Sequence, residues 1–178
     1  LIRFENATPE DVLSRIFGFS SFRGFQAEAV ASAMRGEDAL VLMPTGGGKS
    51  VCYQIPALCR PGMGLVISPL IALMDDQVAA LRQLGVNAAA LHSELEADEL
   101  ARIRSDLNRG ALEILYISPE RLLSPGTSAW LSRQRLSIIA VDEAHCISAW
   151  GHEFRPEYRA LANLPEIFPG VPRMALTA

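Results

Sequence analysis

Met43-Pro44-Thr45-Gly46-Gly47-Gly48-Lys49-Ser50 is the stretch of this sequence that decides the fold. It follows a short apolar run at residues 39–43, which predicts a buried strand, and it opens a segment with helical spacing at residues 49–58. Glycines in such a turn leave backbone N–H groups free to face an anion, and the helix N-terminus adds partial positive charge. Lys49 can reach the terminal phosphates of a nucleotide, and the Ser50 hydroxyl can ligate Mg²⁺. The general phosphate-loop pattern places glycine where this chain has Met43, so the strict pattern fails and only the shorter form remains.

A pair of carboxylates follows a second apolar run, at residues 136–141. Asp142 and Glu143 end this run, and the C-terminal ends of parallel strands are where α/β sheets bind ligands. Asp142 can hold Mg²⁺ through its waters, and Glu143 is placed to orient or deprotonate an attacking water. His145 comes two residues later, and a helix-capping role explains it as readily as a functional one.

Between these motifs the chain alternates apolar runs with amphipathic segments. After a helix that starts at Pro9 and ends near Gly18, we expect helices at residues 26–35, 49–58, 70–84 and 96–108, and strands at 39–43, 65–68, 86–91, 113–117, 138–141 and 173–177. Clusters of glycine and proline at residues 60–64, 124–126 and 165–172 predict loops. This alternation predicts an α/β fold with a mostly parallel β-sheet and helices on both faces.

The composition fits a single domain. The chain has 178 residues, of which 49% are hydrophobic, and no apolar run approaches the ~20 residues that cross a bilayer. The net charge of −4 argues against a generally basic nucleic-acid-binding surface, so any such site has to be local. The three cysteines, Cys52, Cys59 and Cys146, form no Cys-x-x-Cys pair, so we expect buried reduced thiols and read no zinc site from their spacing. The chain starts at Leu1 and stops directly after an apolar run, so we expect a piece of a longer protein.

Two runs of residues resemble the RecQ family of superfamily-two DNA helicases. One is the phosphate loop continued by Val51-Cys52-Tyr53-Gln54-Ile55-Pro56-Ala57, and the other is Asp142-Glu143-Ala144-His145-Cys146-Ile147-Ser148-Ala149-Trp150-Gly151-His152-Glu153-Phe154-Arg155-Pro156-Glu157-Tyr158. The second run is the more specific, because other helicases with Asp-Glu-Ala-His lack its continuation. The resemblance implies a RecA-like P-loop three-layer fold over residues 1–178, with an adenine-recognition helical segment at 1–36 and the P-loop core at 37–178. It also implies ATP and Mg²⁺ as cofactors.

The resemblance assigns the nucleotide contacts residue by residue. Phe19 would stack on the adenine, Gln26 would read its edge with an amide that both donates and accepts, and Arg23 would assist. The phosphates would be held by Thr45, Gly46, Gly47, Gly48, Lys49 and Ser50. This chain departs from the family by having Phe19 where tyrosine is common and Gly24-Phe25 where Pro-Gly is common.

The same resemblance implies a loop that senses single-stranded DNA and couples it to hydrolysis. Its matching residues are Trp150, His152, Phe154 and Arg155, with His145 beside them. Aromatic faces stack on bases, at ~1–3 kcal/mol per base, and the competing interpretation is that Trp150 and Phe154 are core residues of a helix. Ser68 and Arg121 match two further DNA-contact motifs, although ordinary strand ends with helix caps look similar.

For the parent protein, the resemblance implies a DNA helicase that moves 3′ to 5′. Its partners would be single-stranded and duplex DNA and a second RecA-like lobe of the same chain, with no membrane, in the cytoplasm and nucleoid or in the nucleus of a eukaryote. Because the second lobe would supply an arginine finger worth ~10³–10⁵ in rate, we expect the fragment alone to hydrolyse ATP poorly and to unwind nothing.

Two other functions stay open at this point. The chain can belong to an RNA helicase or another superfamily-two nucleic-acid-dependent ATPase, which shares the phosphate loop and the carboxylates. It can also be a nucleotide-dependent binding module without catalytic output, although such a module has no need of Glu143.

Overall fold

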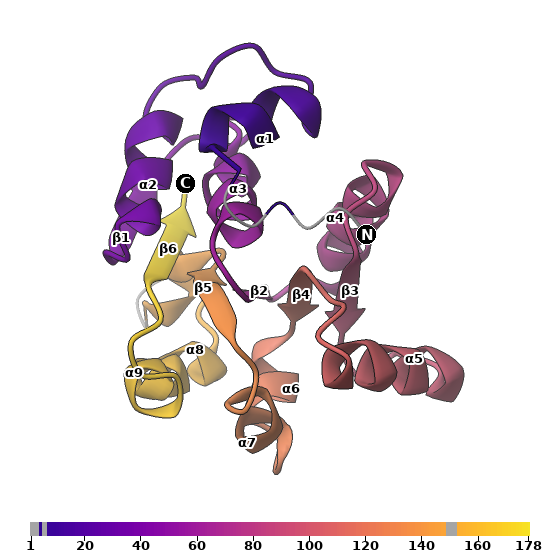
Figure 1. Cartoon of the computed structure of the whole chain (residues 1–178). Coiled ribbons are helices and arrows are strands. Elements are labelled where there is room, and N and C mark those ends of the chain that lie inside the picture. The colour runs from indigo at the N-terminus through magenta and orange to yellow at the C-terminus, as the bar shows by residue number, and fades with distance from the viewer. Residues whose placement is uncertain (1–3, 5–6, 149–152) are drawn as a thin grey trace.

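The computed structural model describes residue 4, residues 7–148 and residues 153–178. In this part of the chain, six strands form one sheet in the order β1-β6-β5-β2-β4-β3, and every pairing is parallel. Figure 1 shows this sheet at the centre of the molecule, with helices on either side of it. The strands are β1 (Ala39–Leu42), β2 (Met63–Ile67), β3 (Ala88–Leu91), β4 (Ile114–Ile117), β5 (Leu136–Val141) and β6 (Arg173–Thr177).

The helices divide into two layers, each with its own apolar core. One core contains residues of α1 (Pro9–Arg15), α2 (Gln26–Met34), α3 (Lys49–Cys59) and α4 (Ile71–Gln83). The other contains residues of α5 (Ala97–Asn108), α6 (Pro119–Leu123), α7 (Thr127–Leu131), α8 (Pro156–Ala160), α9 (Leu164–Ile167) and the 3₁₀ turns η1 (Ala144–Ile147) and η2 (Leu161–Asn163). The predicted three-layer α/β architecture is therefore confirmed.

The central strands alternate their side chains between these two cores. In β2, Val66 packs with the first core, whereas Leu65 and Ile67 pack with the second. In β4, Tyr116 and Ile117 divide in the same way. Both faces are covered, which is why these strands read as continuous apolar runs rather than as alternating ones.

Four expectations need correction. The predicted loop at 60–64 ends at Gly62, because β2 begins at Met63. The first helix ends at Arg15 and not near Gly18. The segment at 165–172 is not all loop, because α9 includes Pro165 in its first turn, where proline leaves no helical hydrogen bond unmade. The strand at 39–43 is only half buried: Val41 is 6% exposed, but Leu40 and Leu42 are 67% and 64% exposed, because β1 lies at the edge of the sheet.

The direction of the strands determines where ligands can bind. All six strands are parallel, so the loops that follow them lie at one rim of the sheet. The phosphate-loop motif follows β1 and the carboxylate pair follows β5. Among the described residues, none of the helices has the length and apolar content needed to cross a membrane.

Candidate nucleotide site and its link to the carboxylates

The phosphate loop is shaped by glycines that no other residue can replace without strain. Gly46 and Gly48 have φ angles of +78° and +80°, in the left-handed region. Gly47 has little room for a side chain, because an added Cβ would lie 2.9 Å from the carbonyl oxygen of Pro44. The Lys49 ammonium donates a hydrogen bond to the carbonyl oxygen of Met43 at 3.1 Å. The amine therefore lies folded over the loop that would hold the phosphates.

A cleft of about 500 Å³ joins this loop to the predicted adenine segment. It is lined by Gly46, Gly47, Gly48 and Ser50 on one side, and by Phe19, Arg23 and Gln26 on the other. Thr45 and Lys49, the other two predicted phosphate contacts, are not part of this lining, and Thr45 is exposed on the loop. The structure thus brings most of the predicted nucleotide contacts into one cleft.

Inside the cleft, Phe19 and Gln26 are held in different ways. The Phe19 side chain is 43% exposed, and the guanidinium of Arg23 lies 5.7 Å from the centre of its ring. Gln26 is buried; its amide nitrogen donates to the carbonyl oxygen of Gly48 at 3.1 Å, and its amide oxygen accepts from the Arg23 backbone N–H at 2.8 Å. Gln26 therefore also ties the adenine segment to the phosphate loop.

Asp142 and Glu143 follow β5, and Asp142 lies within electrostatic reach of Lys49. Burial, with the neighbouring charge of Glu143, raises the pKa of Asp142, while Lys49 and His145 act to lower it. Glu143 has φ +52°, and among the described residues it is the one non-glycine residue with positive φ. Such a backbone costs ~1 kcal/mol or more and is found most often at functional sites. The two motifs that the sequence separates therefore meet at one rim of the sheet.

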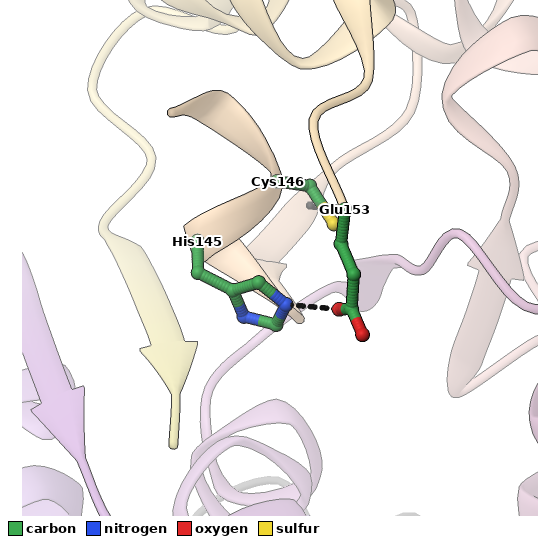
Figure 2. Close-up of side chains that lie close together, drawn as sticks. All are labelled: His145, Cys146 and Glu153. Atoms are coloured by element: carbon green, nitrogen blue, oxygen red, sulfur yellow. Dashed lines mark hydrogen bonds and ion pairs between the residues drawn. The ribbon is translucent and has the colours of Figure 1, made fainter. Parts of the chain in front are cut away.

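His145 connects this pair to two other segments. One ring nitrogen, Nδ1, lies 2.8 Å from the Thr177 hydroxyl at the end of β6 and 3.3 Å from a carboxylate oxygen of Glu143. The other, Nε2, lies 2.5 Å from a carboxylate oxygen of Glu153. Figure 2 marks this contact with a dashed line. The imidazole does not act as a simple helix cap; it bridges the carboxylate pair, the last strand and the segment after residue 152.

The sequence did not predict several buried tyrosine hydroxyls that form hydrogen bonds near the carboxylate pair. The Tyr158 hydroxyl, from α8, donates to the Asp142 carbonyl oxygen at 2.8 Å, and burial raises the pKa of this phenol. The hydroxyls of Tyr53 and Tyr116 form a hydrogen bond of 3.0 Å, and the amide nitrogen of Gln54 donates to the Tyr116 hydroxyl at 2.9 Å. Burial raises the pKa of Tyr116 to about 12, so the cluster is uncharged at neutral pH. Apolar periodicity marks these positions as core and gives no signal of their hydroxyl contacts.

The predicted DNA contacts lie in different surroundings. Ser68 is 1% exposed and Arg121 is half-buried, and their buried atoms Ser68 Oγ and Arg121 Nε have no hydrogen-bond partner among the described residues. Arg155 lines a cleft of about 410 Å³ together with Arg121, and one of its guanidinium nitrogens lies 3.8 Å from Glu120. Phe154 is half-buried, and the guanidinium of Arg159 lies 5.1 Å from the centre of its ring. Trp150 and His152 lie outside the described residues.

Comparison with known proteins agrees with this geometry. The DEAD/DEAH box helicase family matches residues 23–178. The ATP-dependent DNA helicase RecQ of Haemophilus influenzae is 49% identical over 174 residues, which are 98% of this chain and 28% of that protein. The ATP-dependent DNA helicase Q1 of Pongo abelii is 40% identical and is matched over 95% of this chain and 27% of its own length. The chain thus spans little more than a quarter of these relatives.

A solved structure supports the fold independently. The DUF1998 helicase MrfA superposes with a TM-score of 0.75 over 96% of this chain and 28% of its own, at 21% identity. The chain therefore belongs to the DEAD/DEAH box helicase family, and its sequence places it among the RecQ-type members as their first ATPase lobe.

Proposed function

We propose that this lobe binds Mg²⁺·ATP in the cleft and that, within its parent protein, it couples ATP hydrolysis to 3′–5′ movement on single-stranded DNA and to unwinding of duplex DNA. The observation that carries the proposal is that Lys49, at the end of the glycine loop, acts electrostatically on Asp142, the direct neighbour of Glu143. A pure binding module would need the loop and the lysine but not a second carboxylate held in a strained backbone.

The residues on this rim suit a magnesium ion. Ser50 and Asp142 offer hard oxygen ligands, the kind that Mg²⁺ takes, and the buried charge of Asp142 gains most from a cation. When bound, the ion neutralises negative charge on the phosphates. The Lys49 ammonium leaves the Met43 carbonyl and turns to the terminal phosphates, while the loop N–H groups hold the remaining oxygens.

Glu143 carries the chemical step in this proposal. Its carboxylate orients the attacking water and accepts its proton, and Asp142 remains ionised as a ligand. His145 contacts both Glu143 and Thr177, and so positions the Glu143 carboxylate relative to the end of β6. Phe19, Arg23 and Gln26 position the base.

We place the DNA contacts in and around the cleft of about 410 Å³ that Arg121 and Arg155 line. Ser68 and Arg121 hold unpaired polar atoms that can take phosphate oxygens once exposed, and Arg155 lines the cleft next to Arg121. Phe154 and Trp150 would stack on bases, and His152 belongs to the same loop. The chain as a whole has a net charge of −4, so we propose that tight DNA binding needs the rest of the parent protein.

The test is Glu143→Gln in the parent protein, with both lobes present. We expect ATP affinity within about threefold of wild type and DNA-stimulated turnover reduced by a factor of 10² or more. Glu157→Gln, on α8 and outside the cleft, is the matched control and keeps its turnover. Turnover retained in Glu143→Gln would refute the role of this carboxylate.

The choice between DNA and RNA needs its own measurement. Single-stranded DNA should stimulate ATP turnover of the parent protein at least tenfold more than RNA of the same sequence. Equal stimulation would instead favour a general nucleic-acid-dependent ATPase. The isolated 178-residue lobe, without the second lobe, should bind ATP but hydrolyse it slowly and unwind nothing.

A further inference from the structure

Three potential metal ligands of different kinds converge beside the carboxylate pair. The imidazole of His145, the thiol of Cys146 and the carboxylate of Glu153 each offer one atom, and these atoms all lie within 4.8 Å of one another. Figure 2 shows the Glu153 side chain running past Cys146 to the imidazole. His145 and Cys146 belong to η1, whereas Glu153 reaches them from the segment before α8. Their spacing in the sequence does not follow a recognised zinc pattern.

The contacts of the His145 ring suggest that a cation can lie between Nε2 and the Glu153 carboxylate. Nδ1 faces a carboxylate oxygen of Glu143 and the Thr177 hydroxyl, which itself donates to the Ala178 carbonyl oxygen at 3.4 Å. A hydrogen on Nδ1 suits the Glu143 carboxylate, which only accepts. In that neutral tautomer Nε2 carries a lone pair, and it faces the Glu153 carboxylate at 2.5 Å. Two acceptors at that separation need a proton or a cation between them.

The neighbouring thiol favours a cation. A proton would satisfy only Nε2 and Glu153, whereas a metal ion can also take the thiol of Cys146, which otherwise packs as a buried residue of the second core. Metal-binding histidines are normally anchored through their second ring nitrogen, as Thr177 and Glu143 anchor this one. The fold therefore orients the imidazole by contacts that are independent of the other two ligands.

The donor set selects the class of cation. Nitrogen, thiolate sulfur and one carboxylate oxygen suit Zn²⁺ with three protein ligands and an open fourth position. Mg²⁺, which prefers an all-oxygen shell, is disfavoured. Zinc distances of ~2.0–2.3 Å place tetrahedral ligand atoms ~3.3–3.8 Å apart, so the ligands must shift by about 1 Å. The Glu153 side chain is 70% exposed and free to make that shift.

We propose that His145 Nε2, Cys146 Sγ and the Glu153 carboxylate form a binding site for a thiophilic divalent cation of the zinc class. On binding, the thiol releases its proton to solvent and the sulfur, nitrogen and oxygen each donate an electron pair to the metal. Occupancy fastens the segment that carries Glu153 to η1, directly beside Glu143. The site stands on these three residues and does not depend on the function proposed above.

Cobalt is the probe for this site, because Co²⁺ bound to a thiolate gives a near-ultraviolet charge-transfer band. Titration of the reduced 178-residue chain with Co²⁺ should produce this band at one ion per chain, and Zn²⁺ should abolish it. Cys146→Ser should remove the band, and Glu153→Gln should weaken Co²⁺ binding tenfold or more. Cys59→Ser, at a buried thiol of α3 on the opposite face of the sheet, should leave it unchanged.

Two independent variants, Cys146→Ser and Glu153→Gln, test the site, so the misfolding of one leaves the other as a test. Glu153 is exposed, so Glu153→Gln leaves the core intact, and circular dichroism checks the fold of each variant. Absence of the band in the wild-type chain at millimolar Co²⁺ would overturn the proposal. So would a band that persists in folded Cys146→Ser, or equal affinity of Glu153→Gln and the wild type.

Discussion

The amide nitrogen of Gln26 donates a hydrogen bond of 3.1 Å to the carbonyl oxygen of Gly48, the residue that precedes helix α3. The amide oxygen of the same side chain accepts from the Arg23 backbone, so one buried amide joins the adenine segment to the phosphate loop. A Cβ on Gly48 would lie 2.3 Å from the amide nitrogen of Gln26. The two halves of the nucleotide cleft are therefore coupled through a contact that tolerates no side chain at residue 48.

Alanine substitutions of two loop glycines should separate backbone strain from this contact. Gly46 and Gly48 have nearly equal φ angles, but a Cβ on Gly46 meets nothing within 4 Å. Both changes should cost ~1–2 kcal/mol in strain. Gly48→Ala should additionally displace Gln26, lowering the melting temperature further and weakening ATP binding about tenfold more than Gly46→Ala. Thermal unfolding and titration with a fluorescent ATP analogue measure both effects; equal losses in the two variants would show that the Gln26 contact is unimportant.

Asp142→Asn should stabilise the chain in the absence of nucleotide. Burial raises the pKa of Asp142, so the folded chain binds this proton more tightly than the unfolded chain does. The ionised carboxylate therefore lowers the free energy of unfolding at neutral pH, and this penalty is relieved as pH falls through the raised pKa. Asparagine removes the charge, so its melting temperature should exceed that of the wild type at pH 7, by about 2–4 °C per kcal/mol recovered.

The advantage of Asp142→Asn should narrow as the pH is lowered and disappear once the wild-type carboxyl is protonated. Mg²⁺·ATP should raise the melting temperature of the wild type but much less that of the variant. Asp76→Asn, on the exposed face of α4, serves as the control and should change neither quantity. A lower melting temperature for Asp142→Asn at pH 7 would mean that the buried charge is compensated.

Much of this fold could be predicted because its strands are buried on both faces. Continuous apolar runs predicted the positions of all six strands within two residues, and the predicted helix starts at Pro9, Gln26 and Lys49 were correct. Short helices were not predictable in this way. Helices α6, α7, α8 and α9 have four or five residues each, which is too few for an apolar period to emerge.

The site was predictable as a set of residues but not as a set of contacts. The loop and the carboxylates carry sequence signatures because each uses special backbone or charge chemistry. The bridging position of His145 was not predictable, because it depends on the Thr177 hydroxyl and on Glu153, which no local pattern connects to it. The same holds for Gln26, whose amide contacts the loop across 22 residues of sequence.

The ion pair between Asp38 and Arg173 should contribute a pH-dependent part of the stability. Asp38 precedes β1 and accepts hydrogen bonds from the Arg173 backbone and guanidinium at the start of β6, which hold its pKa below the usual range. A lowered pKa stabilises the folded chain above the unfolded value of ~3.9, and this contribution is lost as pH falls through the folded value. The Asp38 side chain is 52% exposed and that of Arg173 is 36% exposed, so solvent screens the pair and Asp38→Asn should cost only ~0.5–1 kcal/mol at pH 7. Urea unfolding at pH 7 and pH 3 measures the difference, which should shrink at pH 3 and in 1 M salt; a cost independent of pH would assign it to packing.

Ser68 and Ser137 form a matched pair for testing whether an unpaired buried hydroxyl is kept for function. Each is 1% exposed, but Ser137 donates to the Ala57 carbonyl oxygen at 3.1 Å, whereas the Ser68 hydroxyl has no partner in the described part of the chain. Ser137→Ala removes a hydrogen bond and should cost ~1 kcal/mol, whereas Ser68→Ala removes an unsatisfied polar group and should leave the free energy of unfolding equal or higher. In the parent protein the variant with the larger effect on activity should be the other one. Ser68→Ala should reduce the stimulation of ATP turnover by single-stranded DNA severalfold, and Ser137→Ala should not. If Ser68→Ala destabilises the lobe as much as Ser137→Ala, its hydroxyl has a structural partner; if it leaves DNA stimulation unchanged, the hydroxyl is not a DNA contact.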